Sequence, residues 1–168
     1  MNKSPSEMSK AEFLQIFGGV FEHSPWIAEG AYDGGLGGTA DSAEGLHRAL
    51  AAVLDQAATE QKRALIVAHP DLAGRLALAG ALTEESTGEQ ASAGLDRCSP
   101  DEFARFQALN DAYKARFGFP FVMAVKRRTR AEILAAFERR VGHDPDTEFD
   151  TALNEIKQIA LLRLRDLL

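Results

Sequence analysis

Residues 68–75, AHPDLAGR, place a histidine where the chain must change direction. The apolar run 65–67 comes just before it and is expected to be buried. Pro70 disfavours the α conformation at His69, so a helix carrying that run should end there, and proline suits the first position of a new helix. An imidazole held at such a junction is suited to proton transfer near neutral pH. The alternative is a histidine that only occupies the break, and this segment alone leaves both open.

A second candidate group lies in residues 83–95, TEESTGEQASAGL, a segment of small side chains with few apolar anchors. Small side chains allow a ligand or a neighbouring helix to approach the backbone. On a helix Ser86 shares a face with Glu89 or Gln90, which brings together a hydroxyl, a carboxylate and a carboxamide. Such a set could bind a small ring that carries several N–H and C=O groups. The alternative is a solvated polar helix.

A third candidate is Arg163, which stands among leucines in residues 160–168, ALLRLRDLL. Arg163 and Arg165 point about 200° apart on a helix, so one of them should lie beside buried surface. A buried arginine needs an anionic partner, either from the protein or from a ligand. The structural alternative is a salt bridge to Asp166 or Glu155.

Helix-start signals recur along the chain. They stand at Ser9 with Glu12, at Ser24 with Pro25, at Asp41 or Ser42, at Ser99 with Pro100 and Glu102, and at Thr129 with Glu132. The first helix should end at the glycine pair 18–19, the second should turn Trp26 and Ile27 inward, and Gly118 should end the fourth. Apolar residues at spacings of three and four predict buried stripes on three of these helices, at Leu46, Leu50, Val53, Leu54, Ala57, at Phe103, Phe106, Leu109, Tyr113, Phe117, and at Ile133, Leu134, Phe137, Val141. A last helix is expected over about 147–168, with a stripe at Leu153, Ile156, Ile159, Ala160, Leu164 and Leu167.

Signals for β-structure are few. The runs 64–68 and 119–125 are rich in β-formers but lack a hairpin partner and an alternating pattern, so residues 119–125, FPFVMAV, are interpreted as an ordered, buried segment between helices. The five glycines between Glu29 and Ser42 predict a flexible loop. We therefore expect an all-α fold, a single-domain helical bundle of about seven to nine helices over residues 1–168.

Composition restricts the class of protein. The chain has 168 residues and a net charge of −6, which disfavours nucleic acid and anionic membranes as partners. A single cysteine, Cys98, excludes an internal disulfide. The sequence contains no apolar stretch of the ~20 residues that a membrane helix needs, and neither a secretory signal nor a peroxisomal one. The expected location is the cytoplasm.

Four separated motifs occur in the order AHPDLAGR, SxxEQxxAGL (residues 86–95), NxxYxxRFGFPFVMAVK (110–126) and EIxxIAxLRLRDL (155–167). Together with FGGVFEHSPWIAE (17–29), this set resembles the family of 2-oxo-4-hydroxy-4-carboxy-5-ureidoimidazoline (OHCU) decarboxylases over essentially the whole chain. Two features depart from the family: MAVK stands where many relatives have a cysteine and an arginine, and the glycine-rich loop 30–38 is not a family feature.

The resemblance implies an all-helical, cofactor-free and commonly homodimeric enzyme. It would convert OHCU to (S)-allantoin, the step after urate oxidase and 5-hydroxyisourate hydrolase, with which it could associate. Matching positions imply three catalytic residues, His69, Glu89 and Arg163. They also imply substrate-binding residues at Pro70, Ser86, Thr87, Gly88, Glu89, Gln90, Phe121, Val122, Met123, Ala124 and Val125. No metal ligand is implied.

These residue types suit the reaction. OHCU carries a carboxylate and a hydroxyl on one ring carbon, and loss of CO2 leaves an electron pair that the conjugated ring can delocalise. His69 is expected to bind or deprotonate the hydroxyl. Glu89 would orient the imidazole or accept substrate N–H groups, and Arg163 would bind the anionic substrate with its planar fork. The backbone of residues 121–125 could satisfy groups of a flat heterocycle.

Two other classes of protein remain as alternatives. One is a non-enzymatic helical scaffold that binds a partner. The other is a metal-dependent hydrolase that would use His69, Asp71, His23 or His143, although the sequence has no HxxxH or HExxH spacing to support it.

Overall fold

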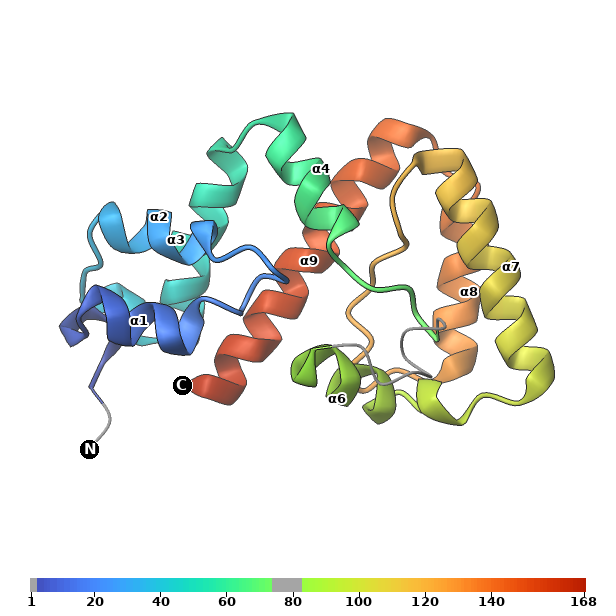
Figure 1. Ribbon diagram of the computed structural model, residues 1–168, viewed down its shortest axis with the longest axis horizontal. Coiled ribbons are helices and arrows are strands. Elements are labelled where there is room, and N and C mark those ends of the chain that lie inside the picture. The colour runs from blue at the N-terminus through green and yellow to red at the C-terminus, as the bar shows by residue number, and fades with distance from the viewer. Residues whose placement is uncertain (1–2, 74–82) are drawn as a thin grey trace. The chain divides into compact units, whose positions relative to one another are not determined.

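The structure is a computed structural model that describes residues 3–73 and 83–168, and these form only helices, turns and irregular segments (Figure 1). Over the described ranges there is no β-strand, which confirms the all-α prediction. The α-helices are α1 (Lys10–Phe17), α2 (Trp26–Asp33), α3 (Ala43–Gln56), α4 (Thr59–Val67), α6 (Glu84–Ser92), α7 (Pro100–Phe117), α8 (Arg130–Arg140) and α9 (Pro145–Leu167). Three short 3-10 helices are η1 (Pro5–Glu7), η2 (Gly38–Asp41) and η3 (Leu95–Arg97).

The chain divides into two compact units, each described by itself. Unit 1 comprises Met1–Ala68 and Ile156–Leu168, and unit 2 comprises His69–Glu155. The helix α9 begins in unit 2 and ends in unit 1. No helix in the described part of the chain has both the length and the apolarity of a membrane span. That the chain is one domain stays a prediction.

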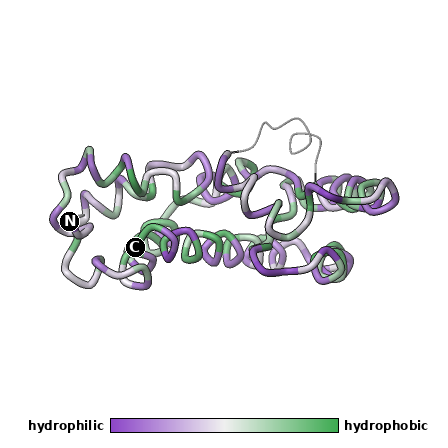
Figure 2. Tube along the Cα trace, turned by 90° about the horizontal axis from the view of Figure 1, so that it is seen from below, coloured by the Kyte–Doolittle hydropathy of each residue, from purple (hydrophilic) through white to green (hydrophobic). Residues whose placement is uncertain are grey.

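Unit 1 is built on buried aromatic and leucine side chains. The ring of Phe13 lies 5.0 Å from that of Phe17 and 5.4 Å from that of Tyr32, measured between centroids. Leu46, Leu50 and Leu54 of α3 and the apolar face of α9 are also buried, and Figure 2 shows polar and apolar residues alternating along α9. Gly30 allows α2 to pack closely on α3, because a Cβ atom there would lie 2.9 Å from Cγ1 of Val53.

Several details of unit 1 differ from prediction. The glycine-rich stretch is not one flexible loop, since its start belongs to α2 and its end forms η2. Ser24 does not cap α2, because its hydroxyl donates to the carbonyl of Glu22 and leaves Pro25 in the capping position. Val67 and Leu167, predicted to be buried, are 54% and 49% exposed, since each lies at the end of its helix.

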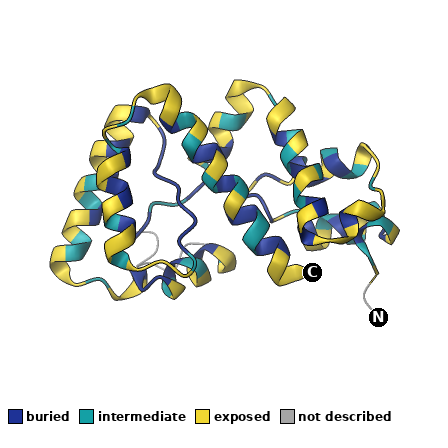
Figure 3. Ribbon diagram, turned by 180° about the vertical axis from the view of Figure 1, so that it is seen from behind, coloured by how far each residue is buried: buried dark blue, intermediate teal, exposed yellow. Residues whose placement is uncertain are grey.

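Unit 2 is organised around aromatic residues. Capping boxes at Ser99–Glu102 and Thr129–Glu132 start α7 and α8 as predicted. The helix α7 ends at Gly118, whose φ of +75° is readily adopted only by glycine. Buried rings from α7, α8 and the segment between them form the core, at Phe106, Tyr113, Phe117, Phe119, Phe121 and Phe137. Residues 119–125 are buried without forming a strand, as predicted, and Figure 3 shows them in the buried colour.

Candidate functional site

The turn around His69 is the first part of the candidate site. The helix α4 ends at Val67, and His69 is buried, so the predicted break is confirmed. The predicted helix starting at Pro70 is not present through Ala73, where the structure shows a turn with φ of +50°. The remaining two residues of the AHPDLAGR motif lie outside the described residues.

Side chains, rather than helical hydrogen bonds, bind the backbone of this turn. The side chain of Gln90 accepts from the Ala73 N–H at 3.0 Å and donates to the Asp71 carbonyl at 3.3 Å. Nδ2 of Asn110 donates to the carbonyl of Leu72 at 3.0 Å. Because buried backbone groups need partners, these bonds explain why the turn is stable without helical structure.

Two more contacts come from α7. Nε2 of Gln107 donates to the Ala73 carbonyl at 3.1 Å, and Nζ of Lys114 lies 2.7 Å from Oδ2 of Asp71. Gln107, Asn110 and Lys114 are not among the site residues expected from the sequence, although Asn110 opens the third motif, residues 110–126. Their spacing of three and four residues, which places polar groups on one face of a helix, was the available signal.

The helix α6 carries the predicted group from Ser86 to Gln90. It begins at the cap Thr83, whose hydroxyl accepts from the Ser86 N–H at 3.2 Å. Ser86 and Gln90 are buried and Glu89 is half-buried, which is consistent with one shared face. Thr87 and Gly88 are exposed. The amide of Gln90 is bound to the His69 turn, so Gln90 has a positioning contact that the resemblance did not imply.

Residues 121–125 are held at three backbone atoms among the described contacts, one of which is the carbonyl of Val125, which accepts from the N–H of Arg128 at 2.9 Å. Nη1 of Arg140 donates to the carbonyl of Val122 at 2.8 Å, and the N–H of Ala124 donates to Oε2 of Glu155 at 3.0 Å. Within the described ranges, the backbone N–H and C=O of Met123 make no hydrogen bond. Among the described contacts, the N–H and C=O of Met123 could therefore still bind a heterocycle, as expected from the sequence.

Arg163 is buried, as one of the two arginines was expected to be, and it belongs to unit 1. Its Nη2 lies 2.9 Å from Oε2 of the buried Glu22, and its Nη1 donates to the carbonyl of Val20 at 3.1 Å. Sequence analysis did not name Glu22 as a partner. Arg165 is exposed and pairs with Glu44 at 2.9 Å.

The units therefore divide the predicted catalytic residues. His69 and Glu89 belong to unit 2, with residues 121–125, and Arg163 belongs to unit 1. The described residues contain no group of three or more His, Cys, Asp or Glu side chains arranged to hold a metal ion. Burial raises the pKa of the Cys98 thiol, which favours its protonated, less reactive form.

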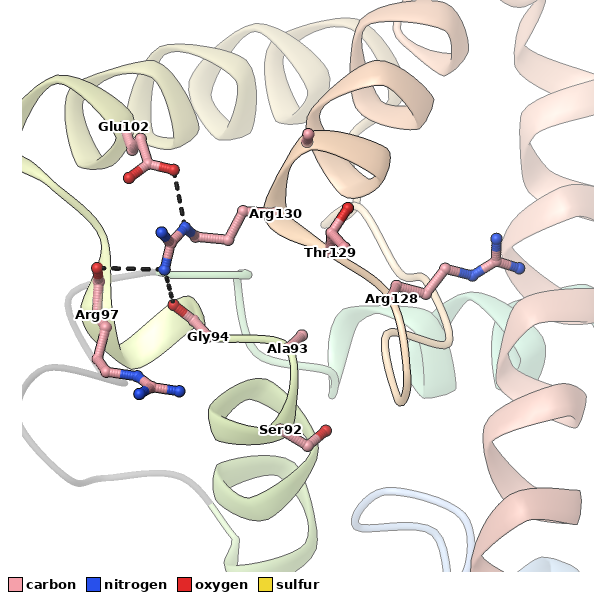
Figure 4. Close-up of a pocket in the computed structure, with 9 residues that line it drawn as sticks. Ser92, Ala93, Gly94, Arg97, Glu102, Arg128, Thr129 and Arg130 are labelled. Atoms are coloured by element: carbon pink, nitrogen blue, oxygen red, sulfur yellow. Dashed lines mark hydrogen bonds and ion pairs between the residues drawn. The ribbon is translucent and has the colours of Figure 1, made fainter.

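Unit 2 also has a surface pocket of about 490 Å³ lined by residues of α6, η3, α7 and the start of α8 (Figure 4). Its central side chain is Arg130, whose Nε lies 2.8 Å from Oε2 of Glu102 and whose Nη1 donates to the Gly94 carbonyl at 3.0 Å. These contacts join three segments of unit 2. The pocket is lined by no residue that was expected in the site from the sequence.

Comparisons with known proteins agree on one family. The sequence pattern of the family described as OHCU decarboxylase matches residues 6–165. A 2-oxo-4-hydroxy-4-carboxy-5-ureidoimidazoline decarboxylase of Haloferax volcanii is 45% identical over 154 residues, covering 92% of this chain and 88% of the relative. A uric acid degradation bifunctional protein of a Bacillus species (strain TB-90) is 37% identical, covering 98% of this chain and 32% of the relative.

A crystal structure of (S)-allantoin synthase is similar in fold, with a TM-score of 0.75 and 31% sequence identity. The alignment covers 96% of this chain and 52% of that one, so this chain spans about half of its length. The match over residues 6–165 and the identity to the Haloferax relative lead to one conclusion: the chain belongs to the OHCU decarboxylase family.

Proposed function

We propose that this protein is a carbon–carbon lyase that converts OHCU to (S)-allantoin in urate degradation. The observation that carries the proposal is the 45% identity, over 92% of this chain, to a relative named for that decarboxylation. The firmly bound turn at His69 supports it, because the resemblance implies a catalytic histidine at that position.

His69 is the proposed acid–base group. It would bind or deprotonate the hydroxyl on the ring carbon that loses CO2, so that the electrons of the broken C–C bond move into the conjugated ring. Hydrogen bonds from Gln90, Gln107 and Asn110 to the following residues fix the turn before substrate binds. Fixing a reacting group in advance lowers the entropic part of the barrier.

Glu89 and Arg163 are the other two proposed catalytic residues. Glu89, half-buried on α6, would orient the imidazole or accept N–H groups of the substrate. Arg163 would bind the carboxylate of the substrate and the negative charge that develops on oxygen. Its contact with Glu22 holds the guanidinium in one orientation.

The proposed substrate-binding residues are Pro70, the α6 residues 86–90 and the segment 121–125. In that segment Met123 has no backbone hydrogen bond among the described residues, so its N–H and C=O are suited to a flat ring with N–H and C=O groups. We propose that the reaction uses no metal and no organic cofactor, which metal analysis of the active purified protein tests.

The central test follows OHCU, generated from urate by urate oxidase and 5-hydroxyisourate hydrolase, by ultraviolet absorbance and circular dichroism. We expect accelerated loss of OHCU and formation of (S)-allantoin. Decay at the spontaneous rate to racemic allantoin would contradict the proposal and favour a non-enzymatic scaffold.

The site is tested by His69→Ala and Glu89→Ala. Each should lower the rate by ~10² or more, because a positioned acid–base or orienting group is lost. The control is His47→Ala, which removes an imidazole bonded to the carbonyl of Lys157 in unit 1 and should leave the rate unchanged. Equal thermal midpoints must accompany the loss. A variant that is inactive only because it unfolds would instead indicate a structural residue.

We further propose a homodimer that acts in the cytoplasm, alongside urate oxidase and 5-hydroxyisourate hydrolase. Support for the shared pathway comes from the Bacillus relative, whose name describes a bifunctional protein of uric acid degradation.

A further inference from the structure

Unit 2 contains a buried charged network that the proposed mechanism does not use. Arg140 of α8 is 3% exposed and Glu148 of α9 is 0% exposed. Nε of Arg140 donates to Oε1 of Glu148 at 2.7 Å. Nη2 lies 2.6 Å from the same oxygen but is not directed at it, so it adds charge attraction without a second hydrogen bond. Burying this ion pair has a desolvation cost, and packed apolar residues in its place often stabilise a protein as well or better.

The carboxylate of Glu148 has two further partners. The hydroxyl of Tyr113 donates to Oε1 at 2.5 Å, and Nδ1 of His143 lies 3.1 Å from Oε2. Burial, together with the bond to Glu148, raises the pKa of Tyr113, so its hydroxyl remains a donor. Glu148 is therefore held from several sides and in turn fixes Arg140.

Arg140, which Glu148 holds in place, also contacts the candidate substrate-binding segment, residues 121–125. Its Nη1 donates to the Val122 carbonyl at 2.8 Å, and its guanidinium carbon lies 4.2 Å from the centroid of the Phe121 ring. That ring is also stacked on Phe137, at 3.8 Å and 9°. One side chain thus fixes two consecutive residues of a segment that has no strand partner in the described part of the chain.

We propose that Arg140 and Glu148 are positioning residues, which set the backbone of residues 121–125 for binding the substrate. The proposal rests on the proposed function and deepens it. Lysine in place of Arg140 would keep the charge but lose the planar fork and its stacking on Phe121, so it could not hold both residues.

The main test compares Arg140→Lys with Arg130→Lys. Arg130 is the control because it also bonds a glutamate and backbone carbonyls within unit 2, and its described hydrogen bonds go to Glu102, Gly94 and Arg97 rather than to residues 121–125. We expect Arg140→Lys to lower kcat/KM for OHCU by about 10–100-fold, mainly through KM, because a displaced segment binds the ring poorly. Arg130→Lys should leave kcat/KM near the wild-type value.

A second readout does not depend on activity. The chain has three methionines, so the methyl NMR signal of Met123 can be assigned with Met123→Leu. Arg140→Lys should shift this signal and Arg130→Lys should not. Tyr113→Phe, which removes one bond to Glu148 but leaves the Arg140–Val122 bond, provides a milder variant if Arg140→Lys does not fold. It should shift the signal by less than Arg140→Lys and raise KM modestly.

The outcomes separate the two proposals. An unchanged Met123 signal together with an unchanged KM would overturn the positioning role while leaving the decarboxylase assignment in place. A wild-type protein that does not accelerate OHCU loss would overturn the proposed function, and the Met123 signal would then still decide whether Arg140 orders the segment.

Discussion

Gln90 and Asn110 show how single residues define the candidate site. The resemblance placed Gln90 among substrate-binding residues, yet both ends of its amide bind the turn that follows His69. Asn110, which was not among the site residues expected from the sequence, donates to the next carbonyl of the same turn. From the sequence alone, polar residues that position a candidate catalytic side chain cannot be told apart from residues that bind substrate. Only their hydrogen-bond partners distinguish the two roles.

At this scale we predict the effect of Asn110→Asp. The change keeps the size of the side chain but replaces the donor to the Leu72 carbonyl with an oxygen. Stability should fall by at least about 1–3 kcal/mol, the cost of a buried unsatisfied group, and by more at neutral pH because the new carboxylate is buried and faces a carbonyl. Decarboxylase activity should fall because the His69 turn loosens. Urea unfolding and the OHCU assay measure both effects.

The control is Asn154→Asp, the same change at an exposed position of α9. It should alter neither quantity. Wild-type activity in Asn110→Asp would show that the turn does not depend on this bond.

At the scale of elements, capping residues account for most of what was predicted correctly. The boxes at Ser9–Glu12, Ser99–Glu102 and Thr129–Glu132 each start a helix where expected. These signals act within four residues, so the sequence alone specifies them. A helix was predicted to start at Pro70, but residues 70–73 are not helical, because side chains of α6 and α7 bind the backbone there. Local signals are overridden where distant side chains supply hydrogen bonds.

The cap of α1 predicts a dependence of stability on pH. A hydrogen bond from Lys3 and one from the backbone N–H of Ser9 lower the pKa of Glu12 from 4.5 to about 2. Since the folded pKa lies below the unfolded one, the ionised cap stabilises the fold above about pH 4.5. That contribution is lost as the pH falls from about 4.5 toward 2.

Glu12→Gln keeps a capping amide but removes the charge, so it should be less stable than wild type at neutral pH. The difference should shrink across the same acidic interval and should be small, because the site is exposed. Thermal unfolding at a series of pH values measures it. A difference that stays constant from pH 7 to pH 2 would contradict the assignment.

At the scale of the whole molecule, unit 1 is assembled from the two ends of the chain. Arg163 of α9 contacts Glu22 and the carbonyl of Val20, more than 140 positions earlier in the sequence. The prediction of a buried arginine with an anionic partner is confirmed, and the partner Glu22 is one that the sequence did not suggest. Glu155, a partner that the sequence did suggest, accepts from Ala124 in unit 2.

This arrangement predicts that Arg163→Met destabilises the protein by about 3–5 kcal/mol, because one member of a buried ion pair is removed while the other, Glu22, stays buried. Arg165→Met, the control two residues away in an exposed pair, should cost about 0–1 kcal/mol. Chemical denaturation measures both changes.

The double variant Arg163→Met with Glu22→Gln separates structure from catalysis. It should regain most of the stability, since neither member of the buried pair is then charged, yet stay inactive if Arg163 binds the substrate. A stable and active double variant would restrict Arg163 to a structural role.

The sequence by itself determined the helical class, most helix starts, the break at His69, the irregular buried segment 119–125 and the resemblance to one family. Capping, proline geometry and apolar spacing act over a few residues and can be recognised without a structure. The tertiary structure decided which side chains hold the turn after His69, that Arg140 binds Val122, and that Arg163 pairs with Glu22. These contacts join residues far apart in the chain. A side chain that forms a hydrogen bond shows no periodic sequence pattern from which its partner could be identified.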